Sequence, residues 1–373
     1  MDFRLSMEQE MLRDSARRYI SAEQLFENRH KRLAEPLQES WRQLADLGWL
    51  ALAVPEVWGG LGSGVEDLAI VAEEMGRGLC VEPFIGCAVL PAGILSRCSN
   101  AAAKELELAG IAGEAACIAV ALYEKGSRYD LRFPVTLARR MGDGSYRLSG
   151  SKILVSGGAD ADKLIVSARI EQNGSGQDGL ALFLLDARLA GIQQHAYRTI
   201  DDGSVADFTF EDVALPADAL LEGSEGALAC LEDAIDEAIL CLCADALGGM
   251  EKVMELTCEY LKIRTQFGRP LADFQALQHS MAEMFIETSD ARSMLHRAIA
   301  SFSAPGDERR KAVSACKVKL MESAKSVAGT AVHLHGGIGV TGEYPVGHYL
   351  RRVIVSERIF GDNAYHMERF LGK

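Results

Sequence analysis

The sequence predicts an α+β protein of three parts, in which a β-domain separates two helical domains. Apolar residues recur at a spacing near 3.6 through residues 1–115, short apolar or alternating runs fill residues 116–222, and helical spacing returns over residues 223–373. These three ranges are the expected domains. Because no helices alternate with the strands, βαβ units are not expected, and the glycine-rich run GGIGVTG at 336–342 does not indicate a Rossmann fold.

Apolar stripes define the helices of the first part. They are Leu12, Ala16 and Tyr19; Leu37, Trp41 and Leu44; and Leu68, Val71 and Met75. Pro36 opens the second of these helices and Gly48 closes it. The glycines of VPEVWGGLGSG at 54–64 break the neighbouring periodicities and predict an ordered loop.

The middle part consists of short runs that are typical of strands. They lie at 118–122, 146–148, 153–155, 164–168, 180–185 and 207–210. The sequences Gly-Asp-Gly at 142–144 and Asn-Gly-Ser-Gly at 173–176 supply turn residues between them. We therefore expect an antiparallel barrel or sandwich.

The last part is predicted to be helical throughout. A long helix carries Met250, Met254, Thr257 and Leu261 on one face. Further helices are expected near 275–302, 308–333 and 345–370.

Composition limits the classes of function. The chain has 373 residues, 48% of them apolar, without a run of about 18 apolar residues, so a membrane-spanning helix is not expected. The charged start MDFRLSMEQEML lacks the pattern of a secretory signal, which predicts a cytoplasmic protein. The nine cysteines stand outside CxxC spacings, so we expect reduced core thiols and no metal site. A formal charge of −14 argues against a nucleic-acid partner.

Four segments together resemble one family, the acyl-CoA dehydrogenases. VPEVWGGLGSG resembles the family's VPExxGGxG loop, and FEDVALPADALL at 210–221 resembles its exit from the β-domain. RTQFGRPLADFQ at 264–275 and HLHGGIGVTGEYPV at 333–346 resemble its RxxFGxxxxxxQ and QxxGGxG elements. The resemblance covers nearly the whole chain. It implies the acyl-CoA dehydrogenase fold with a C-terminal four-helix bundle, FAD as cofactor, acyl-CoA thioesters as substrates oxidised at the Cα–Cβ bond, and dimers or dimers of dimers.

The resemblance also implies which residues bind FAD. They are Arg264, Gln266, Phe267, Gln275, His333, Gly336 and Gly337 in the C-terminal part and Ser156 in the β-domain. In the family the C-terminal groups hold the ADP half of an FAD that is bound mainly by the neighbouring subunit. Arg264 offers a planar fork for phosphate, and the two glycines let backbone N–H groups approach closely. Taken alone, these residues favour a local ion pair and a helix cap; the four segments together favour the cofactor.

The chain departs from the family at the catalytic base. The family's usual base is a glutamate in a C-terminal Tyr-Glu-Gly-Thr-like segment, which here reads RIFGDNAYH at 358–366. Phe360 stands at the glutamate position, or Gly361 if the register slips by one, and neither can take a proton. Some members place the base on the long C-terminal helix, where this chain has Ala238 and Ile239. No catalytic base is therefore expected. The displaced acids that remain nearby are Glu237, Glu357 and Asp362.

The flavin-binding strands of the β-domain also differ. Tyr123 and Lys125 replace a small hydroxyl residue and a proline in the TEPxAGSD-like loop, and Leu154 replaces the aromatic residue of the KxWITNG-like strand. Ser156 is kept as a partner for flavin N5, while His333 replaces the glutamine of the QxxGGxG element. We expect this chain to hold a flavin ring poorly by itself.

The residues that would bind the FAD of a neighbouring subunit are thus kept, whereas the residues that would bind the flavin ring of this chain's own FAD are mostly replaced. This asymmetry is similar to the small subunit of two-gene acyl-CoA dehydrogenases, and residues 246–279 resemble pimeloyl-CoA dehydrogenase small subunits. Heterotetrameric steroid-degrading dehydrogenases share the arrangement. The first hypothesis is such a subunit, with a homologous catalytic partner and electron-transfer flavoprotein or a similar acceptor. The alternatives are a self-sufficient homo-oligomer with a displaced acidic base, and a non-catalytic scaffold.

Overall fold

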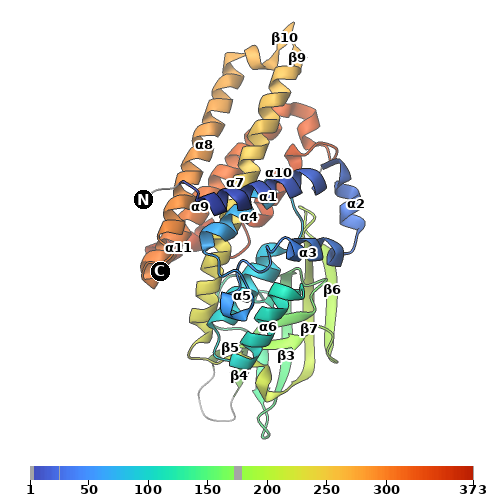
Figure 1. Cartoon of the computed structure of the whole chain (residues 1–373), viewed down its shortest axis with the longest axis vertical. Helices are drawn as coiled ribbons and strands as arrows, with labels where there is room; N and C mark the ends of the chain where they lie inside the picture. The colour runs from blue at the N-terminus through green and yellow to red at the C-terminus, as the bar shows by residue number, and fades with distance from the viewer. Residues whose placement is uncertain (1–3, 25, 172–178, 373) are drawn as a thin grey trace. The chain divides into compact units, whose positions relative to one another are not determined.

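The computed structural model describes residues 4–24, 26–171 and 179–372, and the turn predicted at 173–176 lies outside these ranges. Contacts divide the chain into two compact units. Unit 1 comprises Met1–Ala34, Val65–Cys80 and Ile239–Lys373, and unit 2 comprises Glu35–Gly64 and Val81–Ala238. Figure 1 shows the course of the chain through both units.

Unit 1 is helical. Its elements are α1 (Met7–Glu23), η1 (Phe26–Asn28), α2 (Arg29–Ala34), α4 (Val65–Arg77), most of α7 (Ala227–Ile263), β9 (Thr265–Gln266), β10 (Arg269–Pro270), η5 (Leu271–Asp273), α8 (Gln275–Ala300), α9 (Gly306–His335), η6 (Gly336–Val340), α10 (Val346–Ser356) and α11 (Asn363–Leu371). Helix α9 packs against α8, α10 and α11, and α1 packs on α4. The helices from α7 to α11 confirm the predicted helical C-terminal part, and unit 1 adds α1, α2 and α4 from the N-terminal part to most of it.

The helix expected over 345–370 is in fact two helices. Phe360 and Gly361 have positive φ angles of 59° and 115°, and this left-handed backbone cannot continue an α-helix. Asp362 then caps the start of α11 by accepting the N–H of Tyr365 at 3.0 Å. The prediction of one helix was wrong because it passed over Gly361 and Asp362, whose residue types are typical of a helix end and of a helix N-cap.

Helices α4 and α7 cross within unit 1 at glycines. A β-carbon on Gly76 would lie 1.9 Å from the carbonyl oxygen of Asp245, and one on Gly248 would lie 1.8 Å from that of Glu73. No side chain fits at such separations, so the two helix backbones touch.

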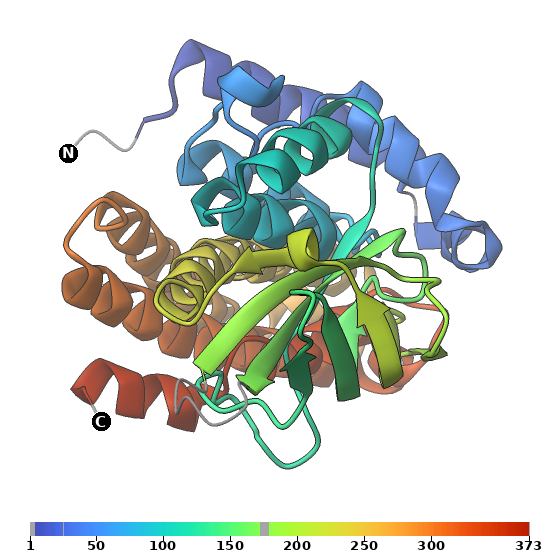
Figure 2. The ribbon, with the colours of Figure 1, turned by 90° about the horizontal axis from the view of Figure 1, so that it is seen from below.

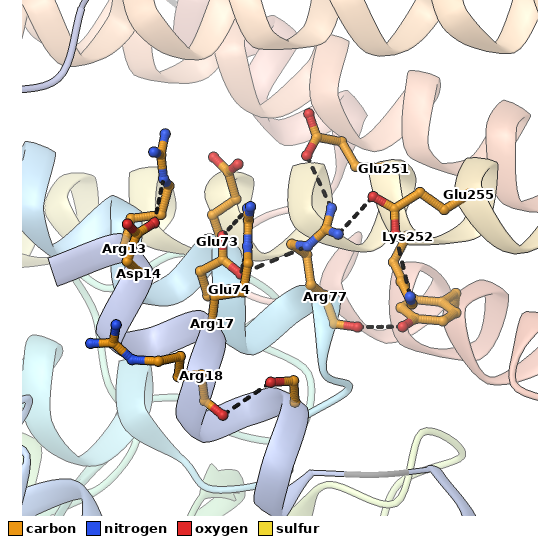
Figure 3. A network of polar contacts seen from close by, with 12 residues as sticks. Arg13, Asp14, Arg17, Arg18, Glu73, Glu74, Arg77, Glu251, Lys252 and Glu255 are labelled. Atoms are coloured by element: carbon orange, nitrogen blue, oxygen red, sulfur yellow. Dashed lines mark hydrogen bonds and ion pairs between the residues drawn. The ribbon is translucent and has the colours of Figure 1, made fainter. Parts of the chain in front are cut away.

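Charged side chains surround this crossing (Figure 3). Arg77 of α4 contacts Glu251 at 3.2 Å and Glu255 at 2.7 Å, both on α7. Arg17 of α1 contacts Glu74 of α4 at 2.6 Å. Each acid here has a cationic partner, so these partly buried charges hold α1, α4 and α7 together as a network.

Unit 2 contains the sheet, several short helices and the first part of α7. The helices are α3 (Leu37–Asp46), η2 (Glu56–Trp58), η3 (Ile85–Val89), α5 (Leu90–Arg97) and α6 (Ala101–Gly113), with a further turn, η4, at Ala217–Ala219. The strands are β1 (Ile118–Ala121), β2 (Leu137–Arg140), β3 (Tyr146–Ser156), β4 (Lys163–Glu171), β5 (Gly179–Asp186), β6 (Ile192–Arg198), β7 (Ser204–Leu215) and β8 (Leu220–Glu222). Their order is β6-β7-β3-β2-β4-β5-β8, with β1 also on β4. Figure 2 shows the curved sheet with α5 and α6 on one side of it.

The sheet is mixed, whereas the sequence predicted an antiparallel one. Strands β1 and β2 both run parallel to β4, with Ile118 opposite Lys163 and Leu137 opposite Arg169. They follow the same edge of β4 one after the other, so together they behave as one strand interrupted by the loop over 122–136. The other pairs in this sheet are antiparallel.

Strands β2, β6 and β8 were missed, and the runs at 146–148 and 153–155 belong to one strand, β3. Strand β6 is an edge strand whose residues are all exposed or half-buried, so it lacks the alternation that marks a strand. Secondary structure changes between Gly113 and Ile118 and again between Glu222 and Ala227. The three-domain division at 115 and 222 stays a prediction.

Candidate functional site

A short hairpin follows α7 and carries the first predicted cofactor residues. β9 pairs antiparallel with β10, and Phe267 and Gly268 form the turn with φ angles of 52° and 81°. Two positive φ angles are typical of a type I′ turn, which matches the twist of the strands. Figure 1 shows this hairpin at the tip of α7 and α8. The turn holds the Phe267 ring 91% exposed.

Arg264 joins α7 to this hairpin. Its N–H donates to the carbonyl of Tyr260 at 2.9 Å, and its carbonyl accepts the N–H of Leu271 at 2.8 Å. The backbone is therefore fixed, while the guanidinium is exposed and has no hydrogen bond or ion pair with the residues that the structure describes. The local ion pair that the residue alone would favour is not formed within that part of the chain. Gln266 and Gln275 are exposed beside it.

The glycine turn after α9 is open on its outer side. Gly336 caps α9 with φ 64° and ψ −139°. A β-carbon built on Gly336 or Gly337 meets no atom within 4 Å, so side chains there would fill accessible space. Both glycines and His333 are exposed. The exposed backbone of such a turn suits a phosphate group.

The two segments meet inside unit 1 through residues that the sequence analysis did not single out as a cluster. The Tyr260 hydroxyl donates to the carbonyl of His335 at 3.2 Å, and the two rings stack at 4.4 Å. Tyr344 lies 5.1 Å from the His335 ring. One signal existed: Tyr260 stands in the last turn of α7, about one helical turn before Arg264.

Apolar side chains are exposed at the end of α7, on α8 and on η6. They are Ile263 (81%), Phe285 (62%), Ile286 (58%), Ile338 (43%) and Val340 (75%), in addition to Phe267. Single exposed apolar residues are normal, but several on neighbouring segments are typical of a surface that another protein covers.

Ser156 lies in unit 2, at the end of β3. A bulge between Lys152 and Val155 turns Leu154 outward, with φ 54° and half of its side chain exposed. The N–H of Leu154 donates to Asp207 at 2.9 Å. An aliphatic side chain is therefore exposed at the position where the sequence analysis expects an aromatic ring from the resemblance.

The loop over 122–136 is anchored by a buried ion pair that the sequence analysis missed. Lys152 donates to Glu124 at 2.7 Å and to Ser167 at 2.9 Å. Glu124 also accepts the backbone N–H of Thr136 at 2.9 Å. Burial lowers the pKa of Lys152 to about 8. Burial acts to raise the pKa of Glu124, but the ammonium and N–H donors outweigh it, so that pKa lies below its ordinary value. This pair has a structural role.

The turn at Phe360 and Gly361, where the sequence analysis expects the family's base, is closed. Phe360 is buried, and its carbonyl accepts a hydrogen bond from Nε2 of His366 at 3.0 Å. A β-carbon on Gly361 would lie 2.3 Å from the Tyr365 ring and 2.8 Å from His366. Neither residue carries an acid, and the turn leaves no space beside Gly361 for one.

The alternative positions on α7 also lack an acid. Ala238 and Ile239 are both buried. The displaced acids all have structural contacts: Glu237 with Arg97 at 3.1 Å, Glu357 with Lys325 at 3.3 Å, and Asp362 as the cap of α11. Among the described residues, no group of histidine, cysteine, aspartate and glutamate could hold a metal ion. None of the described helices is long and apolar enough to span a membrane.

Comparison with known proteins identifies the family. The acyl-CoA dehydrogenase N-terminal, middle and C-terminal domain models match residues 6–114, 119–213 and 228–371. The chain belongs to the acyl-CoA dehydrogenase family. Its fold and its oxidoreductase class follow from this membership, and its cofactor is FAD.

Individual relatives are distant but match over their whole length. The chain is 28% identical to acryloyl-CoA reductase (NADH) of Anaerotignum propionicum, over 98% of this chain and 94% of that one. A variant of the Tcur3481–Tcur3483 steroid ACAD is 30% identical with a TM-score of 0.86, over 98% and 97%. The ChsE4–ChsE5 complex of Mycobacterium tuberculosis is 27% identical with a TM-score of 0.88, over 100% and 98%.

The C-terminal residues of this acyl-CoA dehydrogenase fit the phosphate-bearing half of FAD. An exposed guanidinium supplies positive charge for a diphosphate, the glycine turn supplies accessible backbone N–H groups, and the projecting aromatic ring supplies an apolar face. FAD itself supplies the hydride acceptor when it is bound.

Proposed function

We propose that this chain is the subunit of a heteromeric FAD-dependent acyl-CoA dehydrogenase that lacks the catalytic base and completes the FAD site of a homologous partner. The observation that carries the proposal is the contrast between two sites in one chain. Arg264 and the glycine turn are exposed for a ligand, whereas Phe360 and Gly361 form a closed turn without an acid.

The exposed apolar side chains support a partner at this surface. Ile263, Phe267 and Val340 are the most exposed of that set. Burying one such side chain against another protein contributes about 1.5–3 kcal/mol. We therefore propose that Arg264, Phe267, Gly336 and Gly337 lie at a subunit interface, with the flavin ring held by the other subunit.

Two relatives are heteromeric by their descriptions, the Tcur3481–Tcur3483 steroid ACAD and the ChsE4–ChsE5 complex. They favour a heteromer for this chain, and the first favours a steroid acyl thioester as the substrate. The heterotetramer and the fatty acyl alternative rest on the resemblance in sequence. Electron-transfer flavoprotein as the acceptor and a cytoplasmic location remain expectations from the sequence.

Flavin content tests the proposal. Three samples are compared: this chain purified alone, a homologous acyl-CoA dehydrogenase that keeps the glutamate purified alone, and the two co-purified. We expect the chain alone to be colourless and inactive, and the co-purified complex to contain FAD and to oxidise acyl-CoA. A yellow, active protein on its own would establish the self-sufficient enzyme instead. Absence of activity with every homologous partner would favour the scaffold.

A further inference from the structure

Tyr260 connects the two segments that we assign to the FAD diphosphate. Its hydroxyl donates to the carbonyl of His335, 75 residues away along the chain, at 3.2 Å. Its ring stacks on the His335 ring with centroids 4.4 Å apart and an angle of 25° between the planes. One side chain therefore supplies both a hydrogen bond and a packing surface.

Each end of this contact is adjacent to a proposed ligand group. The carbonyl of Tyr260 accepts the N–H of Arg264 at 2.9 Å, so the last turn of α7 fixes the backbone of the residue that follows the helix. The carbonyl of His335 belongs to the peptide unit that leads into Gly336, where the open glycine turn begins. A shift of the Tyr260 contact would therefore move the guanidinium relative to the glycine N–H groups.

The His335 ring acts as a neutral packing element. Its Nδ1 lies 2.8 Å from the carbonyl of Ala331, and because a carbonyl only accepts, Nδ1 carries the hydrogen. The ring is 3% exposed, and burial lowers its pKa. The centroid of the Tyr344 ring lies 5.1 Å from that of the His335 ring. The cluster is therefore suited to fixing geometry and not to supplying charge.

From these contacts we infer that Tyr260 is a positioning residue for FAD: it sets the spacing between Arg264 and the Gly336 turn before the cofactor binds. This inference rests on the proposed function. A diphosphate has to meet the guanidinium and the backbone N–H groups together. A spacing that is fixed in advance lowers the conformational entropy lost on binding.

The test uses Tyr260→Phe, which removes the hydroxyl and keeps the stacked ring. FAD is titrated into the flavin-free complex of this chain with its partner, and the dissociation constant and the release rate are measured by flavin fluorescence. We expect the dissociation constant to rise about three- to tenfold, as for the loss of one partly buried hydrogen bond. Tyr349→Phe is the matched control, since its hydroxyl also donates to a backbone carbonyl of unit 1, that of Arg77. This control should leave FAD affinity unchanged.

A double-mutant cycle separates positioning from a general structural effect. If Tyr260 acts through Arg264, Tyr260→Phe should weaken FAD binding much less in the Arg264→Ala complex than in the native complex. Equal effects in both backgrounds would overturn the inference. So would unchanged affinity for Tyr260→Phe while Arg264→Ala loses flavin, and in that case the proposed function stands. If Arg264→Ala also leaves FAD affinity unchanged, the proposed function fails. His335→Phe keeps the stacked ring and the carbonyl, and it should retain native affinity.

Discussion

Arg352 of α10 and Asp245 of α7 form a bidentate ion pair inside unit 1. The Nε–Oδ1 distance is 2.9 Å and the Nη2–Oδ2 distance is 2.6 Å. Arg352 also donates to the carbonyl of Cys80 at 2.7 Å. The Asp245 carboxylate is almost fully buried, so the guanidinium satisfies a charge that water cannot reach.

Removing this arginine should destabilise the protein strongly. Arg352→Ala leaves the Asp245 carboxylate buried without its guanidinium, and breaking such a pair costs about 3–5 kcal/mol. Urea unfolding of the purified chain measures the change in the free energy of unfolding. Arg132→Ala is the matched control, because Arg132 pairs with Asp130 on the surface and an exposed pair contributes about 0–1 kcal/mol. Equal losses for the two variants would contradict the role of burial.

The sequence carries no local signal for this pair. Its partners lie 107 residues apart, and each is one charge on an otherwise ordinary helix. The helix stripes were predictable for the opposite reason, since Leu68, Val71 and Met75 repeat with the helical period and are all buried. Local periodicity indicates which face of a helix is buried. It does not indicate which charged residues from distant parts of the chain form an ion pair.

In the candidate site, too, some features were predictable from local sequence and others were not. Arg264, Phe267 and the glycines came from segments whose residue types and spacing are recognisable. The contact between Tyr260 and His335 joins two such segments and becomes visible only in the folded chain. The closed turn at Phe360 was predictable as the loss of an acid, but its left-handed backbone was not.

His366 should make the protein sensitive to acid. The ring is buried between Ser314 and the carbonyl of Phe360, and burial lowers its pKa to about 3. Between this value and the ordinary histidine pKa near 6.5, the unfolded chain binds a proton that the folded chain does not, so stability falls as the pH falls. The loss between pH 6.5 and pH 5 should be about 1.5 kcal/mol.

Urea unfolding at a series of pH values measures this slope. His366→Gln should flatten the slope over that window, although the variant starts from a lower stability. His195→Gln is the matched control, since His195 is exposed on β6, and it should keep the native slope. An unchanged slope in His366→Gln would assign the acid sensitivity to other groups.

Arg264→Ala should lower the flavin content of the complex. The lost charge-assisted contact contributes roughly 1.5–3 kcal/mol, which corresponds to about tenfold or more in affinity. The FAD absorbance per complex measures the change after gel filtration. Arg188→Ala removes another exposed arginine and should leave flavin content as it is. Unchanged flavin content in Arg264→Ala would count heavily against the cofactor assignment.

The last prediction is that no residue of this chain removes the substrate α-proton. A base needs a carboxylate within hydrogen-bonding reach of the substrate α-carbon and with a pKa usable in a dry pocket. The resemblance places the family's two base positions at Phe360 or Gly361 and at Ala238 or Ile239, and none of these residues carries such a group. The displaced acids are held by Arg97, by Lys325 and by the N-terminus of α11.

Glu237→Gln, Glu357→Gln and Asp362→Asn should each leave turnover of the co-expressed complex within about threefold, which is less than about 1 kcal/mol of barrier. Loss of a true base should cost at least roughly a hundredfold. The same substitution of the partner's own glutamate is the positive control and should show that larger loss. Because Asp362 caps a helix, flavin content and thermal stability are measured beside the rate, so that a folding defect is not taken for a chemical one. A large loss of turnover in Glu237→Gln with flavin content intact would place the base on α7 of this chain, and the self-sufficient enzyme would then replace the heteromeric one.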